Sequence, residues 1–427
     1  MKENYLLTSE VARTLYEKYA KDLPVIDFHN HLSVADMESD RRFKNIYELW
    51  IASDPYKHRL MRISGIEERY ITGDATDFQK FYAFASVFPS LVGTPVYEWS
   101  RMELSMLFGI DEILCEENAE EIYNRVNLLL ARDEYSNNGI LSRFNIEYQS
   151  PVFKLTDDLP SFNSSVAPSL RGDELLMPDD VTVKRLGEKS GIKIEKEEDY
   201  LLAVSRLLDK FDGMGCRFAD HALDDGFFRD EKKRDMLVSL SVEYAKRGWT
   251  LLLHLGAKRD TSDRLRSLAG AAGGYAAVGP GFDISALTDM LSDMERAGGL
   301  PRVVLFPLNI SDMEALAVLS GSFSEDGVAS KISLGPAWWW CDHSYGIRRA
   351  LESVASFGVL SRFIGMTTDS RSVLSFVRHD YFRRVLCSWL AEKNERECWE
   401  LDEHALSKLV KKICYENLKE RISYGNI

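Results

Sequence analysis

The sequence has few cysteines, no long apolar run and no excess of positive charge. Its six cysteines are scattered over 427 residues, and no two of them form a CxxC pair. That spacing excludes a disulfide scaffold and favours reduced, buried thiols. No apolar run approaches the roughly 18 residues of a membrane-spanning helix, and residues 1–20 carry charges throughout, unlike a signal peptide. We therefore expect a cytoplasmic protein without a membrane partner.

Negative charge predominates in the composition. Lysine and arginine number 53 against 67 aspartates and glutamates, so the formal net charge is −14. Nucleic-acid binding needs clustered basic side chains, so we expect no nucleic-acid partner. A hydrophobic content of 45% with 11% aromatic residues argues against disorder. The length suits either two or three ordinary domains or one barrel with an insertion.

Short apolar runs alternate with helical patterns along most of the chain, which is typical of β/α units on a parallel sheet. Eight runs are candidate strands, the number that an α/β protein of the (β/α)8 TIM-barrel type needs. They lie at residues 24–29, 146–153, 165–170, 216–221, 250–255, 302–308, 331–336 and 362–367. Helices are predicted over residues 231–247, 283–297, 312–319, 345–357, 379–392 and 402–420.

Residues 32–145 interrupt this alternation. They are rich in aromatic residues and methionine, with helical spacing over residues 41–51 and 119–131. A barrel loop of this length is better explained as an inserted helical subdomain. We expect three parts: residues 1–31 with an N-terminal helix and strand 1, the insertion 32–145, and residues 146–427 with the rest of the barrel. The insertion is placed to roof the active-site mouth.

A His-Asn-His sequence, residues 29–31, follows the first apolar run. Residues i and i+2 of a strand point to the same side, so His29 and His31 are expected to converge. Imidazole is a ligand for zinc, iron and manganese. Polar residues follow the other predicted strands as well, where barrel enzymes carry their catalytic groups: Lys154, Arg171, Asp220, His221, His254, Asn309, Asp342, Asp369 and Arg371.

Asp220 and His221 are neighbours that could either belong to the site or form a purely structural polar pair. The run Trp338–Trp340 is suited to floor a sugar pocket, because aromatic rings stack on the apolar faces of sugars, although three consecutive side chains cannot all face one way. Asp342, just after it, is a candidate for substrate contact or loop orientation.

Several longer segments resemble one protein family. The HxH pair with an aspartate after the eighth strand resembles the amidohydrolase superfamily. The segments IDFHNHL, RRFKNIYELW, RLMRISGIEERYITGDATD, SLGPAWWWCD and GMTTDSRSVLSFVRHDYFRRVLC are similar to uronate isomerases, also called glucuronate isomerases. The resemblance implies conversion of D-glucuronate to D-fructuronate and of D-galacturonate to D-tagaturonate. It also implies a homo-oligomer with one divalent metal ion, most often zinc.

The same resemblance implies roles for particular residues. His29, His31 and Asp369 match the metal ligands, and His254 matches a histidine near the metal. Arg171, Arg371 and Tyr56 match residues that contact the substrate. Arg371 also has a physical reason, because its planar guanidinium binds a carboxylate through two parallel hydrogen bonds. The chain departs from the family at residues 53–59, which read SDPYKHR instead of GDHYKWR, and at 168–174, which read PSLRGDE instead of PSWRPDK.

The expected chemistry is an aldose–ketose isomerisation by proton transfer. Asp369 is the expected base at C2, and Tyr56 or His31 handles the oxygen proton, with His254 as a further catalytic residue. A metal-assisted hydride shift from C2 to C1 is the competing route. A metal-dependent hydrolase acting on a sugar-acid ester, lactone or amide is the alternative function, although the chain lacks the lysine after strand four and the histidine after strand six that binuclear hydrolases use. Sugar-acid binding without turnover is the third possibility.

Overall fold

The computed structural model describes residues 3–160, 162 and 164–423. Its centre is a curled sheet of seven strands, in which all neighbouring strands are parallel. Across the sheet these are β1 (Val25–Asn30), β2 (Ile146–Lys154), β3 (Ser169–Arg171), β4 (Phe218–Leu223), β5 (Thr250–Leu255), β8 (Arg302–Pro307) and β9 (Ile332–Leu334). Because every connection is a crossover, the carboxyl ends of all seven strands lie at one edge.

The eighth predicted strand, residues 362–367, is wrong as a strand. Leu360–Arg362 forms a 3-10 turn, and the residues after it are irregular. The segment nevertheless runs beside β1. The His29 amide donates to the Thr367 hydroxyl at 2.9 Å, and the amides of Asp369 and His31 donate to the carbonyls of His29 at 3.2 Å and Ser370 at 2.9 Å. A hydroxyl thus takes the place of one backbone acceptor, and the regular ladder does not form.

The third predicted strand is shorter than expected. Strand β3 begins only at Ser169, directly after Pro168, while upstream Val166 makes a single bridge to Gln149. Proline has no amide hydrogen, so it cannot donate to a neighbouring strand. The other predicted strands agree with the structure to within about two residues at each end.

The predicted helices of the second half are present. They are α12 (Glu231–Lys246), α14 (Ile284–Arg296), α15 (Met313–Leu319), α16 (Ser344–Phe357) and α17 (Val377–Arg396), and the last predicted helix is α18 (Glu403–Lys411), a π-helical turn (Lys412–Glu416) and α19 (Asn417–Ser423). Aspartate side chains accept hydrogen bonds at the N-termini of three of them, as expected for N-caps: Asp230, Asp283 and Asp402.

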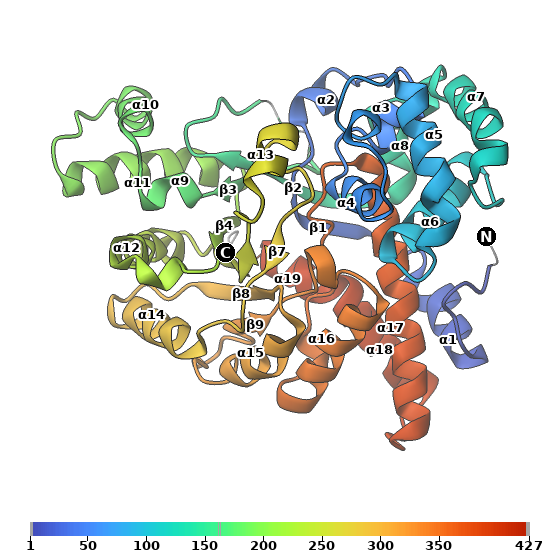
Figure 1. Ribbon diagram of the computed structural model, residues 1–427. Helices are drawn as coiled ribbons and strands as arrows, with labels where there is room; N and C mark the ends of the chain where they lie inside the picture. The colour runs from blue at the N-terminus through green and yellow to red at the C-terminus, as the bar shows by residue number, and fades with distance from the viewer. Residues whose placement is uncertain (1–2, 161, 163, 424–427) are drawn as a thin grey trace.

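After strands β3 and β5, the structure contains several elements that the sequence periodicity did not predict. They are α9 (Asp173–Leu176), α10 (Asp180–Ser190) and α11 (Glu197–Gly213) after β3, and an antiparallel ribbon of β6 (Ala257–Lys258) and β7 (Ala277–Val278), with α13 (Asp263–Ala269) between its strands, after β5. Figure 1 shows α10 and α11 at one side of the sheet and α13 above its edge.

Residues 32–145 are helical, as predicted. Their α-helices are α2 (Val34–Glu38), α3 (Ile46–Trp50), α4 (Pro55–Ile63), α5 (Asp77–Val87), α6 (Pro95–Phe108), α7 (Ala119–Leu130) and α8 (Asn137–Leu141). In Figure 1 these helices gather beside β1 and the upper end of α17, while α1 (Glu10–Leu15) lies against α17 lower down. One continuous apolar core joins them to the sheet.

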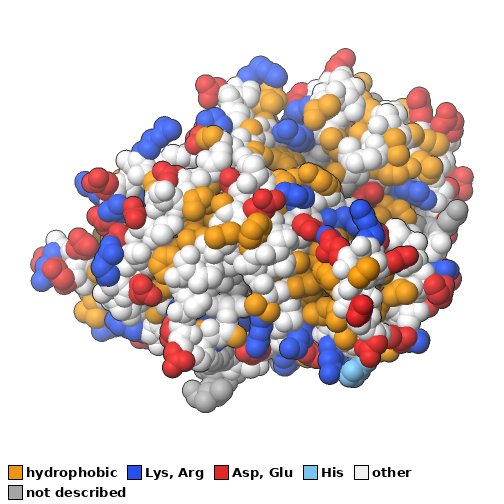
Figure 2. Space-filling view, turned by 90° about the horizontal axis from the view of Figure 1, so that it is seen from below, with side chains coloured by type: hydrophobic (Ala, Val, Ile, Leu, Met, Phe, Trp, Pro, Cys, Tyr) orange, Lys and Arg blue, Asp and Glu red, His pale blue; other side chains and the backbone are white. Residues whose placement is uncertain are grey.

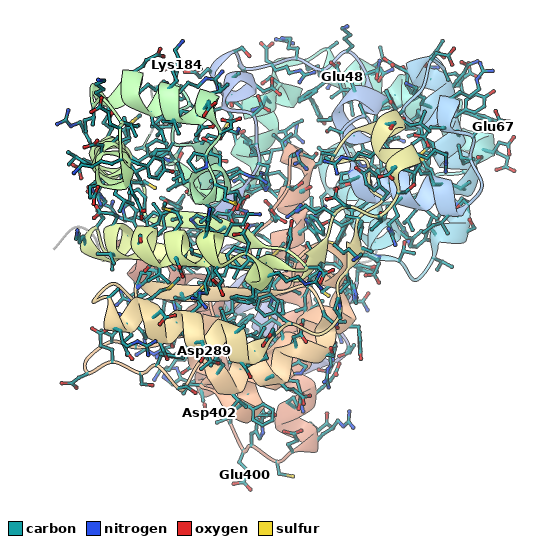
Figure 3. All side chains as sticks on the ribbon, turned by 60° about the vertical axis from the view of Figure 1, so that its left-hand side comes forward. Glu48, Glu67, Lys184, Asp289, Glu400 and Asp402 are labelled. Carbon is teal, nitrogen blue, oxygen red and sulfur yellow. The ribbon has the colours of Figure 1, made fainter. Side chains whose placement is uncertain are left out.

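The surface is polar and mixed in charge. Basic and acidic side chains alternate over the face shown in Figure 2, with small apolar areas between them. In Figure 3, Glu67, Lys184 and Asp289 project outward, whereas the space between the helices and the sheet is filled. No helix in the described part of the chain is both long and apolar enough to cross a membrane.

Candidate active site

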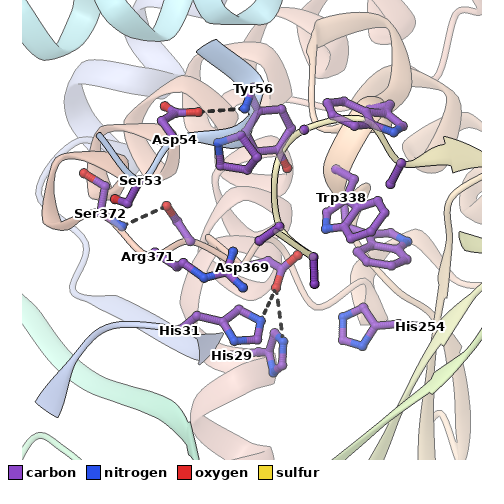
Figure 4. Close-up of a pocket in the computed structure, with 18 of the residues that line it drawn as sticks. His29, His31, Ser53, Asp54, Tyr56, His254, Trp338, Asp369, Arg371 and Ser372 are labelled. Atoms are coloured by element: carbon purple, nitrogen blue, oxygen red, sulfur yellow. Dashed lines mark hydrogen bonds and ion pairs between the residues drawn. The ribbon is translucent and has the colours of Figure 1, made fainter. Parts of the chain in front are cut away.

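A cavity of about 270 Å³ opens at the carboxyl edge of the sheet. Its walls come from strand ends, the ribbon after β5, the loop after β9, the start of α4 and the segment after Gly365, with further residues from α3 and α17 (Figure 4). Eight of the nine residues predicted for the site line it: His29, His31, Tyr56, Arg171, His254, Trp338, Asp369 and Arg371. Asp342, the ninth, is not part of the lining.

His29, His31 and Asp369 form a compact buried cluster. Oδ1 of Asp369 lies 3.2 Å from Nε2 of His29 and 3.0 Å from Nε2 of His31. The imidazole centroids are 5.2 Å apart, because His29 is the next-to-last residue of β1 and His31 follows two residues later. Asp369 adopts a φ of +46° and is held by its amide to the His29 carbonyl. Figure 4 shows both rings meeting this carboxylate.

The donor atoms of this cluster suit a divalent cation. Nδ1 of His29 and Oδ2 of Asp369 are buried and have no hydrogen-bond partner among the described residues. Two imidazoles and a carboxylate are a ligand set that zinc and several other divalent ions accept. The ligand atoms of His29, His31 and Asp369 lie within 4.8 Å of one another, and so do those of His29, Asp220 and His254. Either group of residues could hold a cation, and His29 belongs to both.

The same contacts shift the pKa values of the cluster. Burial alone would raise the pKa of Asp369, but the hydrogen bonds from His29 and His31 outweigh it and hold the pKa well below its usual range. Burial lowers the pKa of His31. The pKa of His29 is raised, because the carboxylates of Asp220 and Asp369 outweigh the effect of burial. Asp369 is consequently an ionised carboxylate at neutral pH.

His254 lies beside the cluster, with its ring centroid 4.8 Å from that of His29, and is held by Asp220. Its Nδ1 is 2.5 Å from Oδ1 of Asp220, and its Nε2 is buried without a partner among the described residues. The imidazole stacks on Phe306 at 4.5 Å between centroids and meets Trp338 edge-on at 4.5 Å. The carboxylate therefore fixes the ring orientation and leaves Nε2 directed away from it.

The suggested structural pair of Asp220 and His221 does not form. Successive side chains of a strand point to opposite faces, so Asp220 faces the cavity while His221 faces α12. There, Nε2 of His221 lies 3.0 Å from the Tyr244 hydroxyl. The partner of Asp220 is across the sheet on β5, which sequence adjacency could not indicate.

Asp27 is a buried residue that the sequence analysis missed. Its carboxylate accepts hydrogen bonds from the Thr367 hydroxyl at 2.8 Å, the Thr368 amide at 2.7 Å and the Thr368 hydroxyl at 2.8 Å. It also accepts from Asn30 Nδ2 at 2.9 Å and lies 3.2 Å from Nε2 of His379. The signal was a carboxylate inside the otherwise apolar run VIDFH, two residues before His29. Asp27 ties β1 to the segment that carries Asp369.

Tyr56 reaches the cavity from the first turn of α4. Asp54 caps this helix, accepting from the Tyr56 amide at 2.9 Å, and Pro55 occupies its first position. The phenol ring packs edge-on against Trp340 and Trp99, with centroids 5.1 and 5.7 Å away. Burial raises the pKa of Tyr56 well above its usual value, so the hydroxyl stays protonated and can donate.

Cationic side chains stand at the mouth of the cavity. Arg371 is exposed, and Arg171 keeps 35% of its side chain exposed while its Nε lies 3.5 Å from Oδ2 of Asp173. Arg259, which the sequence analysis did not select, also lines the cavity. Its guanidinium lies over the Trp339 ring at 4.7 Å and pairs with Asp224 at 2.8 Å. The acidic chain thus places these three arginines at this cavity, two of them paired with carboxylates.

The tryptophan run is divided between the core and the cavity. Trp338 is 4% exposed, and its Nε1 donates to the Phe306 carbonyl at 3.0 Å. Trp339 and Trp340 are partly exposed, and all three line the cavity. Asp342 lies behind this wall, where its Oδ2 is 3.5 Å from Nη1 of Arg378.

Comparisons with known proteins agree along the whole chain. A sequence model described as glucuronate isomerase matches residues 1–237 and 229–421. A uronate isomerase of Caldicellulosiruptor saccharolyticus is 38% identical over 463 residues, covering 99% of both chains. One from Caldanaerobacter subterraneus is 37% identical over 460 residues, covering 98% of both.

Solved structures show the same architecture. A uronate isomerase of Thermotoga maritima superimposes with a TM-score of 0.89 at 28% identity, covering 99% of both chains. A glucuronate isomerase of Caulobacter crescentus also gives 0.89, at 24% identity, and covers 99% of this chain and 97% of its own. Family model, full-length relatives and fold coincide, so the chain belongs to the glucuronate isomerase family.

Proposed function

We propose that the protein interconverts hexuronates by aldose–ketose isomerisation, taking D-glucuronate to D-fructuronate and D-galacturonate to D-tagaturonate. The observation that carries the proposal is one cavity that combines the buried His29–His31–Asp369 cluster with Arg171 and Arg371 at its mouth. The full-length similarity to uronate isomerases supports it.

The proposed cofactor is one divalent cation held by His29, His31 and Asp369. We propose zinc, because two imidazoles and a carboxylate are suitable zinc ligands. Nδ1 of His29 and Oδ2 of Asp369 are buried without a hydrogen-bond partner among the described residues, which supports a bound cation at this cluster. Such a cation polarises a carbonyl or hydroxyl oxygen and stabilises negative charge that develops on it.

The arginines and Asp369 divide the remaining work. Arg371 and Arg171 bind the substrate carboxylate, which fixes the far end of the sugar acid. Asp369 takes the proton from C2, leaving an enediol, and delivers a solvent-exchanged proton to C1. The result is a C2 carbonyl and a new C1–H bond.

The second proton moves between oxygens. The hydroxyl proton of O2 must leave while O1 gains one, so that atoms balance. Tyr56 is protonated and stands above the cavity, which suits it to donate to O1, while His31 is the alternative. His254, oriented by Asp220, is the proposed acceptor of the O2 proton.

The decisive experiment measures ketose formation from both uronates, with the protein as purified, after chelation and after zinc is restored. We expect turnover that chelation abolishes and zinc restores. A purified, zinc-loaded protein that forms no ketose from either uronate contradicts the proposed function. Full activity after complete metal removal would contradict the role of the cation.

Two variants test the carboxylate assignment in the same assay. Arg371→Met should lower kcat/KM roughly 10- to 100-fold, as expected when a charge-assisted hydrogen bond is lost. Arg362→Met is the control, because Arg362 lies in the same segment but pairs with Glu420 at the outside. Equal effects of both substitutions would contradict the assignment.

Solvent deuterium separates proton transfer from a hydride shift. In heavy water, a proton route incorporates deuterium at C1 of the product, whereas a direct hydride shift carries the original hydrogen across. Absence of label under single-turnover conditions would contradict Asp369 as the base.

We also propose the chain organisation that this function needs. Residues 1–31 and 146–427 form the barrel, in which the irregular segment beside β1 takes the place of the eighth strand. Residues 32–145 form an inserted subdomain that covers the mouth of the barrel. The proposed assembly is a homo-oligomer, tested by light scattering of the purified protein.

A further inference from the structure

Arg378 is a buried arginine beside the cavity that the proposed chemistry does not use. It lies near the start of α17, is 3% exposed and lines the cavity. A guanidinium is always charged, so its burial is costly unless neighbours compensate it. Its neighbours come from two parts of the molecule.

On the sheet side, Arg378 holds two loops. Nη1 lies 3.5 Å from Oδ2 of Asp342, in the loop after β9, and 3.4 Å from the carbonyl of Thr368. Thr368 directly precedes Asp369. The guanidinium is therefore anchored one residue away from the proposed base.

On the side of residues 32–145, Arg378 contacts aromatic rings. Its Cζ lies 3.9 Å from the centroid of Trp99 on α6 and 5.4 Å from the centroid of Tyr56 on α4. A guanidinium at such distances is attracted to the ring faces. Tyr56 and Trp99 also meet each other edge-on. One side chain thus joins the helical segment that carries Tyr56 to the loop that carries Asp369.

We propose that Arg378 is a positioning residue that fixes the Tyr56 ring relative to Asp369, through its simultaneous contacts with Asp342, Thr368, Trp99 and Tyr56. It acts on the reaction only through Tyr56 and does not bind the substrate carboxylate. The inference rests on the proposed function of Tyr56 as the oxygen proton donor.

Arginine suits this position better than lysine. A flat guanidinium offers a face to a ring and, at its edge, separate donors for a carboxylate and a carbonyl. Lysine places its charge at one point and cannot do both. Misplacement of a catalytic group by about 1 Å can cost on the order of 100-fold in rate, so loss of this contact has a measurable consequence.

The test is a double-mutant cycle on the zinc-loaded, full-length protein with D-glucuronate. The variants are Arg378→Met, Tyr56→Phe and the double variant, with kcat and KM measured separately. We expect Arg378→Met to lower kcat about 10- to 100-fold while KM changes less than about threefold. In the double variant, kcat should be no lower than in Tyr56→Phe alone, because Arg378 acts through the hydroxyl that Tyr56→Phe removes.

Arg383→Met is the matched control. Arg383 is a buried arginine on the same helix, but it donates to the carbonyls of Lys21 and Pro24, away from the cavity. We expect Arg383→Met to lower the melting temperature without changing kcat and without any coupling to Tyr56→Phe. If Arg378→Met does not fold, Arg378→Lys replaces it, with the same expected coupling to Tyr56→Phe.

The outcomes separate the inference from the function. The positioning role is overturned if the losses of kcat in Arg378→Met and Tyr56→Phe multiply in the double variant. It is also overturned if Arg378→Met changes only KM. A wild-type protein that turns over no uronate overturns the proposed function instead. Equal loss of kcat in Arg383→Met would show that the effect belongs to general destabilisation and also overturns the inference.

Discussion

Asp27 is tied by hydrogen bonds to residues that flank His29 and Asp369, although it does not line the cavity. Four donors and the His379 ring surround its buried carboxylate. Burial would raise the pKa of Asp27, but His379 and the hydrogen bonds outweigh it, and the pKa is lowered. The carboxylate therefore stabilises the fold in its ionised form.

We predict that Asp27→Asn lowers the free energy of unfolding by roughly 3 kcal/mol at pH 7, because the amide places donors against the donors of Thr368. A depressed pKa gives stability that is present above the unfolded value, about 3.9, and is lost as pH falls through the folded value. The difference in free energy of unfolding between wild type and variant should thus narrow below about pH 4. Denaturant unfolding at several pH values measures it.

Asp289→Asn serves as the control for this series. Asp289 is exposed on α14, so its replacement should leave unfolding within about 0.5 kcal/mol of wild type. A gap for Asp27→Asn that stays constant down to pH 2 would contradict the assignment of a depressed pKa.

Residues of the site could be predicted where a short motif holds them. His29 and His31 follow from strand periodicity, and Asp369 and Arg371 from a long family segment. Pairs across the sheet could not be predicted in this way. Asp220 stands beside His221 in the sequence, but its partner is His254, 34 positions away on the neighbouring strand. Such pairing depends on strand order and register, which no local pattern contains.

At the scale of elements, the ribbon after β5 meets the start of α4 across the cavity. A Cβ on Gly274 would lie 2.2 Å from the carbonyl oxygen of Pro55, and Gly274 has a φ of +81°. Arg59 strengthens this contact by donating to the carbonyl of Ala276 at 3.2 Å. The ribbon and the helix N-terminus, which both line the cavity, thus touch backbone to backbone.

We predict that Gly274→Ala separates these elements, lowering both the melting temperature and kcat/KM. Gly191→Ala is a matched control, since Gly191 has a left-handed conformation with a similar φ of +71° but open space where the Cβ would lie. Backbone strain should therefore cost both variants about 1 kcal/mol, and only Gly274→Ala should lose activity. Equal kcat/KM in the two variants would contradict a functional contact.

Elements were predictable where their pattern was long. Helices such as α14 show several turns of apolar spacing and an aspartate cap. The two-residue strands β6 and β7 are too short for any periodicity. The segment beside β1 reads as a strand because it is apolar, yet the Thr367 hydroxyl and the left-handed Asp369 replace the regular ladder there.

At the scale of the whole molecule, one apolar core extends from the N-terminal helix through residues 32–145 to the last helices. Trp50 and Trp99 in the inserted segment belong to the same core as Trp249 and Trp389 elsewhere. Residues 32–145 therefore share their apolar packing with the rest of the chain.

We predict a single unfolding transition for the full chain. Tryptophan fluorescence and far-UV circular dichroism should report coincident thermal or denaturant midpoints, because the parts share one core. A fragment of residues 32–145 should not fold alone. An early transition confined to that segment, or its release as a stable proteolytic fragment, would contradict this prediction.

Arg171 and Arg371 hold, under the proposed function, the end of the sugar acid that does not react. Aldose and ketose carry the same carboxylate, so this interaction is equally strong before and after the reaction. It lowers the concentration at which either compound occupies the cavity and shifts the equilibrium between them in neither direction. The mouth therefore selects sugar acids as a class, while the direction of net conversion depends only on the supply of one compound and the removal of the other.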